Sequence, residues 1–405
     1  MAGRTADGGH RVTVRADLII VGAGLAGAAA AWRASGRGAS VVVLEQFGPA
    51  HRNGSSHGSA RIFRRAYPDP LYVRLTGEAK QQWHALEWEA ADHLLTLTGG
   101  IDFGVKRDPE HLHAVLTGNG VAAELLPARE AARRWPQFDF AGAGPVMFHE
   151  DCGVLDPDRA IAAMLRVAAA KGADIRFDTP VTRLEPGGDG AIVHTGGETF
   201  TAPVAVIAAG AWIAPLMSGL AELPPLTVTQ QQVFHFAPLR PADASAAQSA
   251  DRSAGRPAEQ PPGQPWPVFI VQDEEDNCYG LPGGRDGEVP GAIKIGEHSP
   301  GTITTAAGRD FRVDPASRDR VRGFVARRVP GLDARPVNEV TCLYTSTDNE
   351  DFILDRPGSG PFVIASPCSG HGAKFAPLLG EIIAGLAAGE PAAEHRFTLA
   401  AHLAR

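Results

Sequence analysis

The sequence predicts an α/β fold of two domains, and three observations support this. Residues 18–21 are four consecutive apolar residues, followed by glycines at 22, 24 and 27 and then an alanine-rich stretch. Such an unbroken apolar run is typical of a parallel strand that is buried on both faces. A second apolar stretch followed by a glycine turn occurs at 204–210. The chain has 405 residues, which exceeds the usual size of one hydrophobic core.

The glycines after the first strand have the spacing of a dinucleotide-binding turn. Gly22 allows the tight turn, Gly24 allows the backbone to approach a pyrophosphate, and Gly27 allows the helix to pack closely on the strand. The helix that follows presents free N–H groups to the phosphates. A second strand over 40–44 ends in Glu45, whose carboxylate can accept hydrogen bonds from ribose hydroxyls. Glycines that serve only packing are the alternative interpretation.

The overall composition limits the setting and the class of partner. Hydrophobic residues make up 44% of the chain and charged residues 21%, which is typical of a soluble globular protein. A formal net charge of -8 argues against a nucleic-acid partner, which requires a basic surface. No run of 18 apolar residues occurs, so we expect no membrane partner. The four cysteines lack metal-binding spacing, so we expect no metal site and a reducing, cytoplasmic location.

The first sixteen residues contain no apolar stretch of the kind that a signal peptide requires. We therefore expect 1–16 to be a flexible leader.

A basic, glycine-rich segment follows the second strand at 48–73. It contains almost no acidic residue before Asp69. Because it comes directly after the first strand-helix-strand unit, we expect it to lie over the cofactor or the substrate. A solvated basic loop is the alternative. Its basic residues are His51, Arg52, His57, Arg61, Arg64 and Arg65.

Apolar spacing and turn residues predict the elements up to the second glycine turn. The aromatic residues of the helix expected over 71–96 are predicted to lie in the core. In order, we expect a helix over 71–96, a strand over 99–105, a short helix over 127–134, a helix over 159–171 that begins after Asp156-Pro157, a strand near 174–177 and a hairpin or meander over 181–201.

The composition changes sharply at 238–267, which is rich in Ala, Ser, Pro, Gly and Gln. Such a stretch cannot offset the entropy lost on ordering, so we expect a flexible surface insertion. The strands that flank it, at 230–236 and 268–271, are able to pair with each other. A later strand at 292–298 carries Lys294 among apolar neighbours. This lysine either protects an edge strand from aggregation or faces a cavity, where desolvation lowers its pKa.

Two late segments each combine a buried strand with a polar turn. Residues 339–355 have Cys342 in a strand, with an aromatic residue two positions later. Residues 362–375 form a strand, a Ser-Gly-His-Gly turn and the start of a helix. A glycine-rich turn that leads into a helix faces anions favourably. It would therefore stabilise negative charge on a reduced cofactor ring.

Five motifs together resemble the monomeric sarcosine oxidase and N-methyltryptophan oxidase family, flavin amine oxidases of the D-amino-acid oxidase-like superfamily. The motifs are GAGLAG, GSSHGSARIFRRAY, AIKIGEH, CLYTSTDNEDFILD and SGHGAKF, and the matches run from residue 17 to beyond 390. The resemblance implies a glutathione-reductase-like, Rossmann-type FAD-binding domain and a second, catalytic domain with a mixed sheet. It places FAD binding in 17–65, 155–225 and 335–395, and catalysis in 66–154 and 226–334.

The resemblance also implies roles for individual residues. Cys342 matches the cysteine whose sulfur tethers FAD covalently. Lys294 matches a lysine associated with oxygen activation, where positive charge stabilises developing superoxide. Arg64 and Lys374 match the pair that holds the substrate carboxylate. The other implied positions are Arg61, His57 and His371 near the flavin ring, Tyr279, His298 and Tyr344 in the substrate cavity, and Val181, Gly210, Gly370, Gly372 and Lys374 at the cofactor.

Two of these positions keep a plainer alternative. Tyr344 is equally compatible with a core residue, and His298 with a surface histidine at the end of a strand.

The activity implied by the resemblance is oxidation of a secondary amine or N-methyl amino acid. FAD carries the electrons, O2 is the acceptor, and the products are an imine that hydrolyses to an aldehyde and an amine, and hydrogen peroxide. We expect a monomer. The runner-up is an imino-acid or biosynthetic amine oxidase with a pipecolate-like or proline-like substrate. An NAD-dependent dehydrogenase and a non-catalytic flavin-binding subunit are further alternatives.

The chain departs from the family pattern at several positions. Ser59, Ala60 and Arg65 replace the usual Asp, Thr and His of the basic loop, and Cys278 stands where an aromatic residue is common. The insertion at 238–267 is also long. These differences leave the identity of the amine open.

Overall fold

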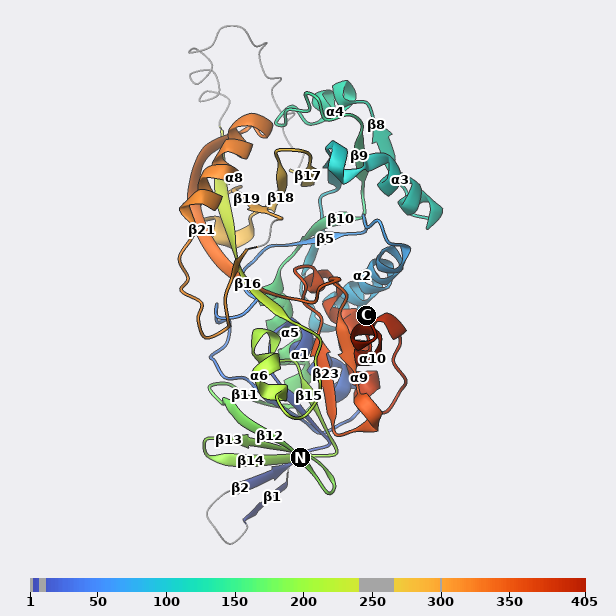
Figure 1. Cartoon of the computed structure of the whole chain (residues 1–405), viewed down its shortest axis with the longest axis vertical. Helices are drawn as coiled ribbons and strands as arrows, with labels where there is room; N and C mark the ends of the chain where they lie inside the picture. The colour runs from blue at the N-terminus through green and yellow to red at the C-terminus, as the bar shows by residue number, and fades with distance from the viewer. Residues whose placement is uncertain (1–2, 7–11, 240–265, 299–300) are drawn as a thin grey trace.

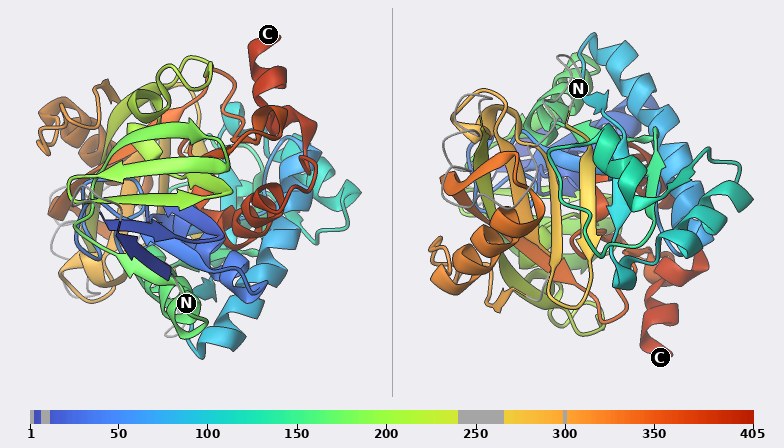
Figure 2. Two further views of the ribbon diagram at one scale, coloured as in Figure 1. Left: turned by 90° about the horizontal axis from the view of Figure 1, so that it is seen from below. Right: turned by 90° about the horizontal axis from the view of Figure 1, so that it is seen from above.

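The computed structural model describes residues 3–6, 12–239, 266–298 and 301–405, which form four β-sheets and the helices that cover them (Figure 1). A six-stranded sheet with its helices occupies the lower half of the view, and a nine-stranded sheet the upper half. Views along the long axis show a five-stranded sheet at one end of the molecule and the nine-stranded sheet toward the other (Figure 2). None of the helices in these ranges is long and apolar enough to cross a membrane.

The six-stranded sheet is assembled from three separate stretches of the chain. Its strands are parallel except for the last, which is antiparallel to its neighbour. The helices α1 (Leu25–Gly36), α5 (Pro157–Ala170) and α9 (Ala376–Ala387) cover one face. The strand order is β11 (Asp174–Arg176), β4 (Val41–Leu44), β3 (Leu18–Val21), β15 (Val204–Ile207), β23 (Phe362–Ser366) and β22 (Ile353–Asp355). The predicted α/β fold with a Rossmann-type unit is confirmed.

The five-stranded sheet covers the other face of this unit, and it corrects the expectation of a flexible leader for the described residues of that segment, which are 3–6 and 12–16. Residues 12–15 form a strand that pairs in parallel with β14, and Val14 is buried. Alternating valines favour such a strand, but its parallel partner lies more than 180 residues away in the sequence. The order is β1 (Gly3–Ala6), β2 (Val12–Arg15), β14 (Glu198–Ala202), β13 (Gly190–Thr195) and β12 (Val181–Gly187).

The nine-stranded sheet contains the strands on both sides of the insertion, and the suggestion that these two pair was wrong. The hairpin of β18 and β19 lies between them. The order is β20 (Thr302–Ile303), β16 (Thr227–Pro238), β19 (Ile293–Glu297), β18 (Asn277–Pro282), β17 (Val268–Gln272), β7 (Gly100–Phe103), β9 (Val146–His149) and β8 (Glu124–Leu126), with β21 (Leu332–Ser346) also paired to β16. Most of 238–267 lies outside the described residues.

The position of β19 decides between the two interpretations of Lys294. This strand pairs with β16 on one side and β18 on the other, so it is not an edge strand. Lys294 is buried and lines a cavity. The edge-strand interpretation was therefore wrong.

The two faces of the nine-stranded sheet have different roles. One face packs in an aromatic core with α8 (Pro315–Arg328) and α4 (Ala128–Arg134). The register of the strands brings the alternate side chains together on the opposite face, which we call the roof because it covers the cavity described below. From one side to the other, its members include Cys342, His235, Lys294, Tyr279, Asp102 and His149.

The first long helix is shorter than expected. It spans α2 (Pro70–Ala90) and begins where the Asp69 side chain accepts a hydrogen bond from the Leu71 N–H at 2.9 Å. Its end is set by Ala91, whose φ of 49° is left-handed. The residues that follow form β6 (Leu95–Leu97) in a small sheet with β10 (Cys152–Leu155) and β5 (Arg61–Arg64). The other α-helices of the described residues are α3 (Pro109–Gly118), α6 (Ile213–Met217) and α10 (Leu399–Leu403).

Candidate active site

A cavity of about 710 Å³ lies between the carboxyl ends of the six-stranded sheet and the roof. It is lined by five sequence motifs that are far apart in the chain, from the first glycine turn to the Ser-Gly-His-Gly turn. Pockets at the carboxyl ends of parallel strands are the usual ligand sites of such sheets. Of the residues predicted from sequence, those that line it are Gly22, Gly24, Glu45, His57, Arg61, Val181, Gly210, Tyr279, Lys294, Cys342, Tyr344, Gly370 and Gly372.

The glycine turn has a different steric reason for each of its glycines. A Cβ at Gly22 would lie 2.5 Å from the Ala208 carbonyl oxygen, and one at Gly27 would lie 1.9 Å from the Gly22 carbonyl oxygen. These two glycines are required by the fold itself. A Cβ at Gly24 would meet only the Ser56 side chain, at 3.2 Å. The space above Gly24 therefore belongs to the cavity, as expected for a turn that admits a pyrophosphate.

Glu45 lies at the end of β4, where the ribose of a dinucleotide is expected. Its carboxylate accepts hydrogen bonds from the N–H groups of Ala23 at 2.8 Å and Phe47 at 3.0 Å. Burial acts to raise its pKa, but His51 and these two N–H groups lower it, so the group is an anion. The turn, the acid and the volume of the cavity all fit a dinucleotide such as FAD.

The Ser-Gly-His-Gly turn lies just before α9. A Cβ at Gly370 would lie 2.5 Å from the Tyr344 ring, and one at Gly372 would lie 1.8 Å from the Pro367 carbonyl oxygen. Because the Tyr344 ring and the Pro367 carbonyl oxygen lie this close to the turn, both positions require glycine. The turn is thereby packed against the same strand, β21, that carries Cys342.

Two cations converge on one backbone oxygen at the centre of the roof. Lys294 Nζ and Arg61 Nη1 donate to the Ala60 carbonyl oxygen at 3.0 and 2.9 Å. Burial and the charge of Arg61 lower the pKa of Lys294 to about 7. Burial, Arg61 and Lys294 lower the pKa of nearby His57 to about 2, so this histidine is neutral. The cavity thus holds concentrated positive charge.

Sequence reasoning missed His235, which pairs with Lys294 across the strands of the roof. It is buried and lines the cavity. Burial and the charge of Lys294 lower its pKa to about 4. No sequence signal marks it, because its position depends on the register between β16 and β19.

Tyr279 of the roof pairs with Tyr344, since their side chains hydrogen-bond to each other. Burial raises the pKa of Tyr279 to about 12, and it also raises the pKa of Tyr344. Both residues line the cavity. Tyr344 is therefore not only a core residue, whereas its contact with substrate stays a prediction.

Arg64 and Lys374 lie outside the lining of this cavity and form a second cluster next to the Gly370 turn. Both flank the ring of Tyr67, with the Arg64 guanidinium carbon 4.2 Å and Lys374 Nζ 5.5 Å from its centroid. Lys374 Nζ donates to the His371 carbonyl oxygen at 2.7 Å. Burial and the charge of Arg64 lower the pKa of Lys374. Tyr67 was not predicted as a site residue, although it lies within the basic segment at 48–73.

The hydrogen bonds of His371 define its tautomer. Its Nε2 lies 3.0 Å from the Glu350 carbonyl oxygen, which can only accept, so Nε2 carries the proton. Its Nδ1 then accepts from the Tyr67 hydroxyl at 3.0 Å. Burial and Lys374 lower the pKa of His371 to about 3, so the ring is neutral. His371 therefore orients Tyr67 between the two cations.

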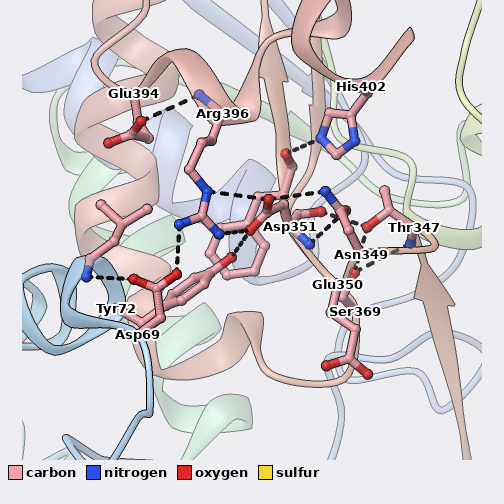
Figure 3. A network of polar contacts seen from close by, with 12 residues as sticks. Asp69, Tyr72, Thr347, Asn349, Glu350, Asp351, Ser369, Glu394, Arg396 and His402 are labelled. Atoms are coloured by element: carbon pink, nitrogen blue, oxygen red, sulfur yellow. Dashed lines mark hydrogen bonds and ion pairs between the residues drawn. The ribbon is translucent and has the colours of Figure 1, made fainter. Parts of the chain in front are cut away.

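A polar network around buried Asp351 ties the C-terminal segment to this cluster (Figure 3). Asp351 accepts hydrogen bonds from the Tyr72 hydroxyl at 2.9 Å and from Arg396 Nη2 at 2.7 Å. Arg396 Nη1 also pairs with Asp69 at 2.6 Å, at the start of α2. The Tyr72 ring stacks on Tyr67 with centroids 5.2 Å apart. The network thereby fixes the aromatic floor of the cation cluster.

His298 lies at the end of β19 and is exposed, as the surface interpretation predicted. It nevertheless interacts electrostatically with Glu350, Arg64 and Lys374. Its role toward a substrate stays a prediction.

Comparison with known proteins identifies one matching family model and many similar proteins. The model of the FAD dependent oxidoreductase family matches residues 17–386. Monomeric sarcosine oxidase of Streptomyces avermitilis is 33% identical over 380 residues, which cover 92% of this chain and 93% of that protein. N-methyl-L-tryptophan oxidase of Citrobacter koseri is 30% identical over 381 residues, covering 92% and 95%. The solved structure of NikD, an unusual amino acid oxidase essential for nikkomycin biosynthesis, has a TM-score of 0.78 at 26% identity and covers 94% of this chain and 96% of that one.

Proposed function

This chain belongs to the FAD dependent oxidoreductase family, and on that basis we propose that it oxidises a secondary amine or an N-methyl amino acid in the manner of sarcosine oxidase. Relatives that carry the sarcosine oxidase name are 30 to 33% identical over about nine tenths of the chain. The observation that carries the proposal is a single cavity lined by the glycine turn, Lys294 and Cys342 together. An NAD-dependent dehydrogenase does not account for the distant motifs that the family model also spans.

The proposed cofactor site follows the long cavity from the glycine turn to the roof. Gly24 and the start of α1 would hold the pyrophosphate, and Glu45 would hold a ribose. When bound, FAD takes up the electrons of a C–H bond next to nitrogen and passes them to O2, giving hydrogen peroxide. Arg61 and Lys294 supply positive charge at the roof, where negative charge develops on the reacting oxygen.

The proposed carboxylate site is the cluster of Arg64 and Lys374. In the described part of the chain, no aspartate or glutamate forms an ion pair with either cation. Lys374 is buried and Arg64 half-buried, and a buried cation without an ion-pair partner is costly, so an anionic ligand stabilises the cluster. An arriving carboxylate would raise the pKa of Lys374 and keep it protonated. The amine end of the substrate would then point toward the cavity that holds the roof cations.

A peroxide-coupled screen tests this function. Purified protein is supplied with sarcosine, other N-methyl amino acids, pipecolate and proline in turn. We expect peroxide from at least one N-methyl amino acid. A response to pipecolate or proline alone would assign the enzyme to imino-acid oxidation, which is the alternative function. A screen without any peroxide would contradict the proposal.

We propose that Cys342 holds FAD covalently. The thiol is buried and lines the cavity. Cys342→Ser is expected to leave the protein folded while the bound flavin becomes extractable. Precipitation in acid measures this, since a tethered flavin stays with the wild-type pellet and leaves the variant pellet. Cys278→Ser serves as a control because that buried thiol lies on the core face of the sheet. Release of flavin from the wild-type protein would refute the tether.

The protonation of Lys294 predicts a pH dependence of the oxygen reaction. Burial lowers its pKa from 10.5 to about 7, so the cation is present below this pH and lost above it. The rate of flavin reoxidation is therefore expected to fall as pH rises, with an inflection between 7 and the ordinary value. Negative charge on a reduced cofactor moves the inflection upward within that range. Stopped-flow reoxidation of reduced enzyme measures it, and an inflection that persists in Lys294→Met would rule out this lysine.

Three further features are part of the proposal. O2 is the acceptor, and the protein is a monomer, by analogy with relatives named monomeric sarcosine oxidase. None of the four cysteines forms a disulfide, which is compatible with a reducing compartment such as the cytoplasm.

A further inference from the structure

A third cation, Arg107, joins Arg64 and Lys374 in the cluster next to Tyr67. Arg107 follows β7, and its Nη2 donates to the Ala66 carbonyl oxygen at 3.3 Å. Arg64 Nη1 donates to the same oxygen. Two guanidinium groups thus share one acceptor, and Lys374 lies on the same aromatic ring as Arg64. The positive charges are concentrated far beyond what one backbone oxygen can neutralise.

Among the described residues, one carboxylate forms an ion pair with this cluster, and the Glu350 carboxylate acts on Tyr67 from farther away. Asp102 Oδ1 lies 2.6 Å from Arg107 Nε, and the Asp102 side chain is 3% exposed. With Lys374 protonated by an arriving anion, three cations face one ion-paired carboxylate, which favours a ligand with more than one negative charge. The α-carboxylate of an amino-acid substrate supplies one of them. The second remains to be supplied by another group of the ligand.

Asp102 and its neighbour His149 belong to the roof, on the same face of the sheet as Tyr279 of the cavity lining. Asp102 pairs with Ile270, which in turn pairs with Tyr279 of the cavity lining. His149 lies two residues along the same face of β9, next to Gly100. It is 1% exposed, and neither ring nitrogen has a hydrogen-bond partner among the described residues. An unpartnered buried imidazole of this kind is available to a ligand.

We propose that the substrate carries a second acidic group, held by Arg107 and His149 while Arg64 and Lys374 hold the α-carboxylate. The substrate class is then an N-substituted acidic amino acid, such as an N-methyl dicarboxylate. This inference rests on the proposed amine oxidation. The plainer interpretation is that Arg107 and Asp102 form a closed ion pair with only a structural role.

Spectral titration of the holoenzyme distinguishes the two interpretations without turnover. Succinate and butyrate differ by a carboxylate in place of a methyl group, and each is titrated against the visible flavin spectrum at constant ionic strength. We expect succinate to bind about tenfold more tightly than butyrate, as one charge-assisted contact implies. In Arg107→Met this preference disappears while the affinity for butyrate changes less than about twofold.

Two further variants accompany Arg107→Met. Arg107→Met leaves Asp102 buried without a partner, so the double variant R107M/D102N, which removes both charges, is measured as well. It is also expected to lose the succinate preference while retaining the wild-type melting temperature more closely than R107M. Lys106→Met is the matched control, because that neighbouring lysine is exposed and pairs with exposed Glu274 at 2.8 Å. It should bind both acids as the wild type does.

Equal binding of succinate and butyrate to the wild type would overturn the inference. So would an equal loss of both ligands in the double variant, which is the signature of a structural ion pair. The matched amines N-methyl-L-aspartate and N-methyl-L-2-aminobutyrate then separate this inference from the proposed function. If the aminobutyrate alone reduces the flavin, the second acidic site is refuted and amine oxidation stands. If neither these nor other amines reduce it, the proposed function fails even where succinate is preferred.

Discussion

Gly24→Val is expected to yield a folded protein that no longer binds FAD. The Gly24 Cβ position faces the cavity and meets only the flexible Ser56 side chain. A valine there would occupy the space required by the pyrophosphate, so the Kd for FAD should rise at least about a thousandfold, or about 4 kcal/mol. Fluorescence titration of the apoprotein with FAD measures the affinity, and circular dichroism reports whether the fold is retained.

Gly27→Val is the matched comparison, since it changes the neighbouring turn of the same motif. Its Cβ would lie 1.9 Å from the Gly22 carbonyl oxygen, within the backbone of the fold. We expect this variant to lose about 4 kcal/mol or more of folding free energy and to express poorly. If both variants unfold alike, Gly24 has a structural role, and its assignment to a pyrophosphate site is incorrect.

Lys294→Met is expected to slow reoxidation of the reduced flavin by O2 about 100-fold to 1,000-fold. The ammonium group is buried at the roof and shares the Ala60 carbonyl oxygen with Arg61. Removal of one preorganised charge from a site that excludes water has effects of this size on the reacting state. Methionine has a similar length and an apolar end, so the cavity keeps its shape.

The two half-reactions separate the role of Lys294 from a general defect. Anaerobic reduction by substrate should change less than about tenfold in Lys294→Met, because the carboxylate is proposed to bind at Arg64 and Lys374. Lys294→Arg tests for the charge, since it keeps the cation while changing its shape. Equal slowing of both half-reactions in the Met variant would mean that the lysine orients the cofactor and has no special role with oxygen.

Local patterns predicted those parts of the fold whose determinants lie close together in the sequence. The apolar run at 18–21 and its glycines specify a buried strand and turn without reference to anything distant. Val12 to Arg15 was assigned to a flexible leader but forms a strand, since four residues with alternating polarity do so only when a partner is present, and no local pattern reveals that partner. That partner, β14, lies more than 180 residues later in the chain.

The candidate site was predicted to the extent that single residues match a motif. Lys294 kept two interpretations because strand order, which separates an edge from an interior strand, is not encoded in the strand itself. Asp102, His149 and His235 were missed for a related reason. Each faces the roof only through the register between strands from distant segments. Tyr67 could have been predicted as a site residue, since it lies three residues after Arg64 in the same motif. The Arg64 guanidinium packs on its ring.

The most direct test of an FAD-dependent amine oxidase is anaerobic mixing of the purified protein with an N-methyl amino acid while the visible spectrum is recorded. The proposed function predicts a flavin spectrum at the start, bleaching of its absorbance by the amine, and full recovery with formation of hydrogen peroxide when air is admitted. A protein without flavin absorbance after FAD has been supplied, or a flavin that stays oxidised with every N-methyl and cyclic amino acid tried, would contradict it.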